Sequence, residues 1–163
     1  MLDAMAVSLD YFQENFGPYQ FDYARVIEFP GYATFAQAFA GTVPYSERIG
    51  FIANTADDDD IDYVTYVTAH EYGHQYWAHQ LISAYMQGGT VMVETMAQYS
   101  ALMVMKEIYG EEQIRRFLKY ELDAYLSSRG SEAIEELPLN RVENQGYIHY
   151  RKGAVVMLSL IHI

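Results

Sequence analysis

Residues 63–80 read YVTYVTAHEYGHQYWAHQ and hold the most informative pattern of the chain. The pattern predicts a helix over these residues. Because an α-helix completes a turn in about 3.6 residues, His70 and His74 lie on one face and both imidazoles can reach one ion. Glu71 lies one position further round, where its carboxylate can reach a water on that ion but is badly placed to bind the ion itself. The stretch therefore predicts two metal-binding histidines beside an acid–base glutamate.

A third donor is expected from the next helix, predicted over 93–109. Glu94 lies between Met92-Val93 and Met96-Ala97, and a charge in an apolar face is costly unless it is paired or binds a metal. A turn at 87–89, which contains two glycines, would bring Glu94 back to the two histidines. Imidazole suits zinc, and a catalytic zinc site keeps one position open for water. The alternative is that two histidines happen to lie four residues apart on a buried helix.

Composition limits the class of protein. The chain has 163 residues, 51% of them hydrophobic, which fits one compact domain. Its 22 acidic and 10 basic residues give a net charge of −12, which argues against a nucleic-acid partner. The absence of cysteine excludes a disulfide scaffold and any thiolate metal site. The sequence has no basic start typical of a signal peptide, and it stops abruptly, so we expect a single, truncated domain over 1–163.

The order of expected elements predicts an α+β fold that is mostly helical, with strands and helices segregated. Asp3 is the expected N-cap of the first helix, and Gly110 is expected to separate two later helices. The acidic run 57–60 lacks the ligand pattern of a calcium loop, so we expect a solvated turn. The expected helices are 4–16, 63–80, 93–109, 111–128 and 147–160, the expected strands are 23–29 and 49–53, and 32–44 is expected to be irregular or a short helix.

The chain resembles the gluzincin aminopeptidases of the aminopeptidase N family in three features: the His70–His74 motif, Glu94, and Tyr150-Arg151-Lys152-Gly153. The interval 75–93 is one residue longer than is usual in that family, a difference that the turn can absorb. The chain also resembles a bacterial branch in which such a domain is fused to an ABC-type permease. The resemblance covers only part of the family's catalytic domain. It implies a thermolysin-like fold, peptide substrates and one zinc ion per chain, held by His70, His74 and Glu94.

The resemblance also implies a role for Tyr150. Family enzymes carry Tyr-x-Lys-Gly on a downstream helix, and the tyrosine hydroxyl stabilises the oxyanion of the tetrahedral intermediate. Zinc and one phenol donor would then share the charge that develops on the scissile carbonyl oxygen. Tyr147, three residues earlier on the same face, is the alternative.

The amino-terminal recognition element of the family is less clear. Family enzymes have a Gly-x-Met-Glu-Asn segment whose Glu binds the substrate's α-ammonium group, and this string is absent. The nearest counterpart is Glu47, which lies ahead of the expected strand 49–53 and would recognise a free amino end by ion pairing. Alternatively, Glu47 is a surface residue paired with Arg48, and the enzyme is an endopeptidase.

The resemblance therefore implies zinc-dependent removal of amino-terminal residues from peptides, with Glu71 as general base and Tyr150 as oxyanion donor. Two other classes stay open. One is an inactive zinc-binding or interaction domain of a larger membrane permease, and the other is a helical interaction domain whose histidines are incidental. The resemblance also suggests a tether to a membrane protein through flanking segments, with this segment itself soluble.

Overall fold

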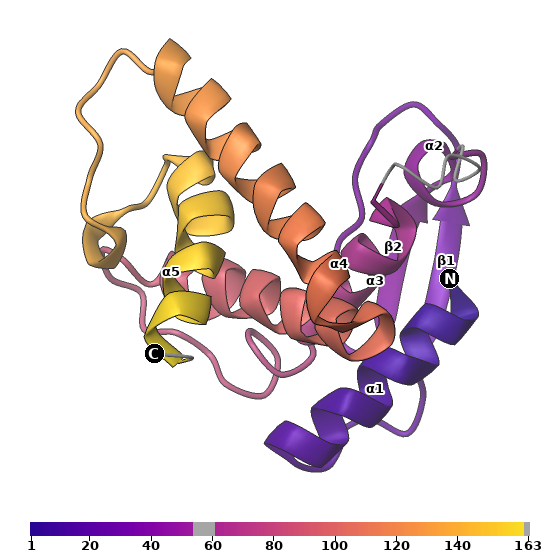
Figure 1. The fold of residues 1–163 in the computed structure, drawn as a ribbon. Coiled ribbons are helices and arrows are strands. Elements are labelled where there is room, and N and C mark those ends of the chain that lie inside the picture. Colours follow the sequence, from indigo (N-terminus) through magenta and orange to yellow (C-terminus); the bar gives the residue numbers. More distant parts are fainter. Residues whose placement is uncertain (54–60, 162–163) are drawn as a thin grey trace.

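The computed structural model describes residues 1–53 and 61–161, which form a mostly helical fold with a small sheet (Figure 1). The acidic run 57–60 lies outside the described residues. The sheet has two parallel strands, β1 (Arg25–Phe29) and β2 (Thr42–Ser46), with Arg25 opposite Thr42 and Phe29 opposite Ser46. Residues 36–39 run antiparallel to β2, with bridges from Ala36 to Tyr45 and from Phe39 to Thr42. This irregular segment therefore lies along a strand that it also precedes in the chain.

The second strand lies earlier than the sequence pattern predicts. β2 begins inside the segment 32–44, which was expected to be irregular or a short helix, and the short helix α2 (Glu47–Gly50) occupies the start of the expected strand 49–53. Val43 and Tyr45 of β2 are buried, and Pro44 lies between them. Ser46 then caps α2 by accepting a hydrogen bond from the Arg48 amide at 3.3 Å. Pro44 interrupts the alternating pattern by which a strand is recognised in a sequence. The Ser46 cap favours a helix at the start of the expected strand 49–53.

The first helix, α1 (Leu2–Phe16), packs on the core through Ala4, Ser8 and Phe12. Asp3 lies in its first turn, and Met1 occupies the N-cap position that was expected for Asp3. An acidic side chain in the first turn still interacts favourably with the helix dipole.

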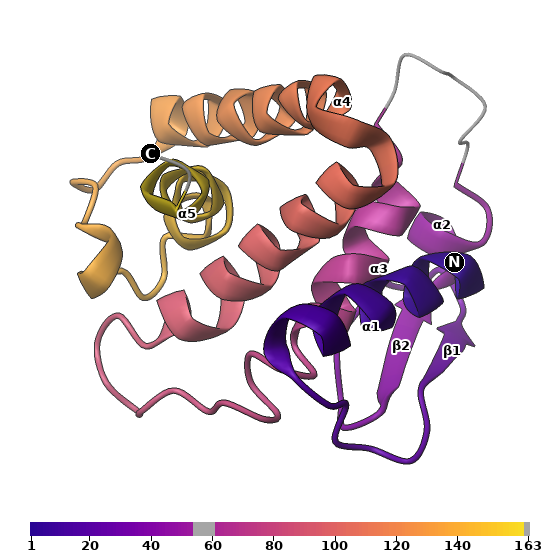
Figure 2. The same cartoon turned by 60° about the horizontal axis from the view of Figure 1, so that its bottom comes forward.

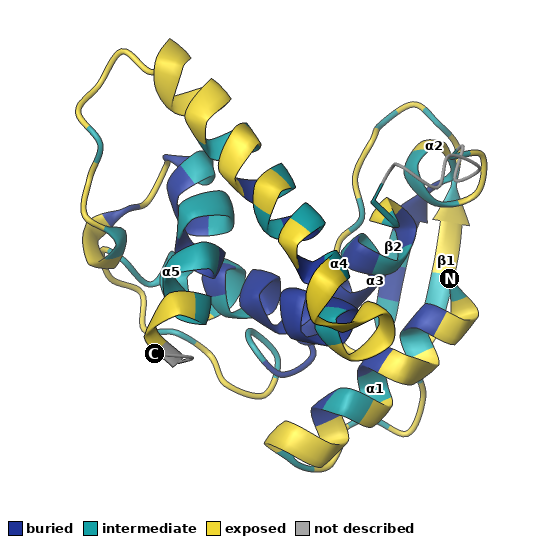
Figure 3. Cartoon of the chain, in the orientation of Figure 1, coloured by how far each residue is buried: buried dark blue, intermediate teal, exposed yellow. Residues whose placement is uncertain are grey.

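The histidine helix, α3 (Tyr63–Gly73), begins at Asp62, whose carboxylate accepts a hydrogen bond from the Thr65 amide at 3.0 Å. The helix is buried on most of its surface (Figure 3). It is shorter than the predicted 63–80, but His74 keeps a helical backbone and donates its amide to the His70 carbonyl oxygen. The one-turn relation between the two histidines is therefore preserved.

The remaining helices are η1 (Val91–Thr95), α4 (Met96–Ser131), η2 (Leu139–Arg141), η3 (Tyr147–Lys152) and α5 (Gly153–Ile161). Both η1 and η3 are π-helical, a geometry that is frequent at functional sites. Gly110 interrupts α4 with φ of 80°, which favours glycine, so the break expected at this residue is found as a kink. The second half of α4 folds back, and α5 lies in the angle between the two halves (Figures 1 and 2).

The core joins α1, β2, α3 and the first half of α4, with smaller contributions from the second half of α4 and from α5 (Figure 3). Its largest fully buried side chains include Tyr45, Tyr72 and Leu102. Within 1–53 and 61–161, no helix combines the length and the apolar character needed to cross a membrane.

Candidate metal centre

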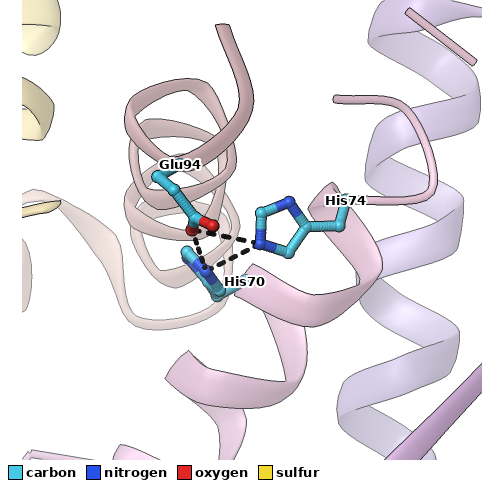
Figure 4. Close-up of side chains that lie close together, drawn as sticks. All are labelled: His70, His74 and Glu94. Carbon is cyan, nitrogen blue, oxygen red and sulfur yellow. Dashed lines mark hydrogen bonds and ion pairs between the residues drawn. The ribbon is translucent and has the colours of Figure 1, made fainter. Parts of the chain in front are cut away.

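Two histidine side chains from α3 point to one place (Figure 4). The Nε2 atoms of His70 and His74 are 3.0 Å apart, and both side chains are about nine-tenths buried. The other ring nitrogen of His74, Nδ1, lies 3.1 Å from the Trp77 carbonyl oxygen. A hydrogen bond at Nδ1 leaves Nε2 as the nitrogen that can bind a metal.

Glu94 approaches the same place from η1 (Figure 4). Its Oε2 lies 3.4 Å from Nε2 of His70 and 3.3 Å from Nε2 of His74. Close helix packing makes this approach possible, because a Cβ atom at Gly73 would lie 3.3 Å from Cα of Ala97. The glycine between the two histidines therefore lets the chain that carries Glu94 come near.

The three donor atoms fit a zinc ion. They lie within 4.8 Å of one another and comprise two imidazole nitrogens and one carboxylate oxygen, a donor set that zinc favours. Tetrahedral zinc, with ligand distances of about 2.0–2.1 Å, places its donors about 3.3 Å apart. The observed separations of 3.0–3.4 Å agree with that arrangement.

The electrostatics of the cluster favour an ionised Glu94 beside positively charged histidines. Burial opposes the charged form of Glu94, but hydrogen bonds and charge from the two histidines hold its pKa well below the usual range. Burial disfavours the charged form of His74, but the Glu94 carboxylate outweighs it and raises the pKa of His74. A cation bound between these residues would take the place of the proton.

Glu71 lies beside the cluster and is 6% exposed. It lines two cavities, of about 390 and 240 Å³, which share His70 and Tyr150 in their walls. Burial raises the pKa of Glu71, while the charges of His70 and His74 oppose that shift. A carboxylate with a raised pKa beside a metal site is suited to exchange protons with water.

Tyr150 reaches the cluster from η3. Its ring centre lies 5.8 Å from that of His70, and its side chain lines the same cavity as His74 and Glu94. Burial and the Glu94 charge raise the pKa of Tyr150, so the hydroxyl keeps its proton. The alternative, Tyr147, stacks on Tyr125 and lines a different cavity. Of the two tyrosines, the structure brings Tyr150 to the donor atoms.

The chain is similar in sequence and in fold to known proteins. Residues 1–163 match the description "Peptidase family M1 domain". The chain belongs to peptidase family M1. A search of curated proteins found no match.

The fold of this M1 domain is similar to a crystal structure of a mutant M1 zinc metallopeptidase from Deinococcus radiodurans. The TM-score is 0.67 and the sequence identity 21%, and the match covers 96% of this chain and 32% of the other. The chain thus spans about a third of the length of the structure it matches. Membership of family M1 identifies the chain as a domain of a peptidase family.

The structure does not bring Glu47 to the donor cluster of the M1 domain. Glu47 follows β2 and begins α2, and its Oε1 accepts a hydrogen bond from the Gly31 amide at 2.6 Å. It is not among the residues that line either cavity at the cluster. The predicted pairing with a substrate amino group therefore stays a prediction.

Sequence reasoning missed the contact that joins the two π-helices. The Thr95 hydroxyl donates a 2.6 Å hydrogen bond to the carbonyl oxygen of His149. A Cβ atom at Gly153 would lie 2.6 Å from the same hydroxyl, so a glycine is needed for this approach. Only the position of Thr95, next to Glu94, could have drawn attention to it.

Proposed function

We propose that this M1 domain hydrolyses peptide bonds with one zinc ion per chain. His70, His74 and Glu94 would hold the ion, Glu71 would act as general base, and Tyr150 would stabilise the oxyanion. The observation that carries the proposal is the meeting of three donor atoms within 4.8 Å at a cavity wall that includes Glu71 and Tyr150.

When bound, the zinc ion supplies Lewis acidity, which lowers the pKa of water and withdraws charge from a carbonyl oxygen. Glu71 accepts a proton as the water attacks the peptide carbonyl carbon. It then delivers that proton to the departing amine. Its burial supports this role, because the raised pKa brings the carboxylate closer to the pH range in which it can both take and release a proton.

Tyr150 keeps its proton at neutral pH and can donate a hydrogen bond to the carbonyl oxygen as negative charge develops there. The Tyr150 side chain packs beside His70 and lines the same cavity as Glu94, so it lies near the donor cluster before substrate arrives. The motif Tyr150-Arg151-Lys152-Gly153 also supports the narrower proposal that the domain is thermolysin-like and belongs with the aminopeptidase N group of the family.

We propose peptides with a free amino end as substrates, with Glu47 as the group that binds the ammonium. Endopeptidase activity is the second candidate, and the hydrogen bond from the Gly31 amide to Glu47 favours it because that carboxylate oxygen is already engaged. The fusion to a permease suggested by the sequence resemblance would tether the domain to a membrane. In that setting an inactive zinc-binding domain is the third possibility.

One assay separates these functions. The zinc-loaded chain is offered a peptide with a free amino end and the same peptide acetylated, beside a Glu71→Gln variant. Release of the first residue from the free peptide alone supports the aminopeptidase, and internal cleavage of both supports the endopeptidase. Zinc binding without hydrolysis of either would contradict the enzymatic proposal.

A further inference from the structure

Glu121 is a fully buried carboxylate on the second half of α4. Its Oε1 accepts hydrogen bonds from the Tyr66 hydroxyl at 2.9 Å and the Gln98 amide at 3.1 Å. The Arg151 guanidinium donates a third at 2.8 Å and forms an ion pair with it. These partners come from α3, from the first half of α4 and from η3, so one carboxylate joins three segments of the fold.

Arg151 directly follows Tyr150 in η3, so the ion pair fixes the backbone next to the proposed oxyanion donor. The Arg151 guanidinium also lies over the Tyr120 ring, 5.1 Å from its centre. On the other side of Tyr150, Thr95 holds the His149 carbonyl oxygen. Both neighbours of Tyr150 are therefore tied to α4 or η1.

A buried ion pair is a weak source of stability, because removing two charges from water costs about as much as their attraction returns. Its position next to Tyr150 suggests a different benefit. A network with several donors on one carboxylate fixes geometry, and a reacting group displaced by about 1 Å can lose much of its effect.

We propose that Glu121, through Arg151, is a positioning residue that holds the Tyr150 side chain toward the His70–His74–Glu94 donor cluster. The inference rests on the proposed role of Tyr150 in hydrolysis. The kink at Gly110 is part of the arrangement, because it turns the second half of α4 back toward η3.

The kinetic test uses Glu121→Gln and Arg151→Lys in the zinc-loaded chain. Glu121→Gln retains an oxygen acceptor but removes the negative charge. Arg151→Lys retains the positive charge but removes the planar guanidinium group and its several N–H donors. Each should lower kcat about tenfold with little change in KM. Asp123→Asn is the matched control, because Asp123 lies on the same helix, exposed, in an ion pair with Lys119.

Coupling to Tyr150 is then measured with the double variant Glu121→Gln/Tyr150→Phe. If Glu121 acts through Tyr150, adding Glu121→Gln to Tyr150→Phe should lower kcat by less than about twofold. An equal tenfold loss in both backgrounds would overturn the proposal, as would unchanged kcat in the folded Glu121→Gln and Arg151→Lys variants.

A second readout needs neither zinc nor turnover. The chain is labelled with carbon-13 at the Cζ atoms of its tyrosines, and NMR spectra are recorded. The signal of Tyr150 is the one that is absent from the spectrum of Tyr150→Phe. We expect this signal to shift or broaden in Glu121→Gln and Arg151→Lys and to stay in place in Asp123→Asn. An unmoved signal in both variants would overturn the positioning role. Full activity of Tyr150→Phe would instead contradict the proposed function, whatever the signal does.

Discussion

The donor cluster and the region around Glu47 differ in how the chain builds them. His70 and His74 are one helical turn apart, and Glu94 joins them through a close helix contact at Gly73. Glu47 lies at the junction of β2 and α2, and its position depends on how β2 pairs with its neighbours. Local spacing thus specifies two of the three donors, whereas the position of Glu47 depends on strand register. The donor cluster concerns the chemistry of the reaction, whereas Glu47 concerns the choice of substrate.

The largest effect is expected from Glu71→Gln, because the amide cannot accept the proton from water. We expect turnover of a peptide substrate to fall by about a thousandfold or more while the zinc content stays that of the parent chain. Peptide hydrolysis and elemental analysis on the same preparation measure both. Comparable activity in the variant would remove Glu71 from the proposed mechanism.

Tyr150→Phe removes one hydrogen bond to the developing oxyanion and should lower kcat about a hundredfold, with a small change in KM. Tyr147→Phe is the matched control, since Tyr147 lies in a different cavity. Steady-state kinetics on one peptide compares the two. A larger loss in Tyr147→Phe would reverse the choice between the tyrosines.

Glu47→Gln tests whether the region around Glu47 recognises the amino end of a substrate. If Glu47 binds the substrate's ammonium group, KM for a peptide with a free amino end should rise about tenfold, and the acetylated peptide should stay uncleaved by both the parent and the variant. Glu28→Gln, at an exposed position on β1, is the control. A fall in thermal stability with unchanged KM would show that Glu47 stabilises the fold through its hydrogen bond with Gly31 and does not bind the substrate.

The smallest effect is expected from Gly153→Ala, which tests the packing that brings η1 and η3 together. The new Cβ would meet Thr95 at 2.6 Å, so we expect unfolding free energy to fall by about 1–2 kcal/mol. Gly130→Ala is the control, because a Cβ there meets nothing within 4 Å. Urea denaturation of both variants checks the prediction, and equal stabilities would contradict it.

Features set by local spacing could be predicted from the sequence, whereas features set by tertiary packing could not. Helical period placed His70 and His74 on one face, the apolar neighbours of Glu94 pointed to a buried role, and Gly110 marked the break in α4. The strand over 42–46 was missed because Pro44 interrupts its alternation, and because packing in the core buries Val43 and Tyr45. The end of α3 at Gly73 and the hydrogen bond from Thr95 to His149 likewise depend on tertiary packing, which no local pattern contains.

The zinc content of the purified, folded chain, measured by elemental analysis beside His74→Ala and His79→Ala, tests the metal centre itself. His79 provides the matched control, because its Nε2 lies 3.3 Å from the Ala38 carbonyl oxygen and it is not part of the donor cluster. We predict about one zinc per chain, lost in His74→Ala and retained in His79→Ala. A folded chain that binds no zinc, or binds it equally in His74→Ala, would contradict the metal centre.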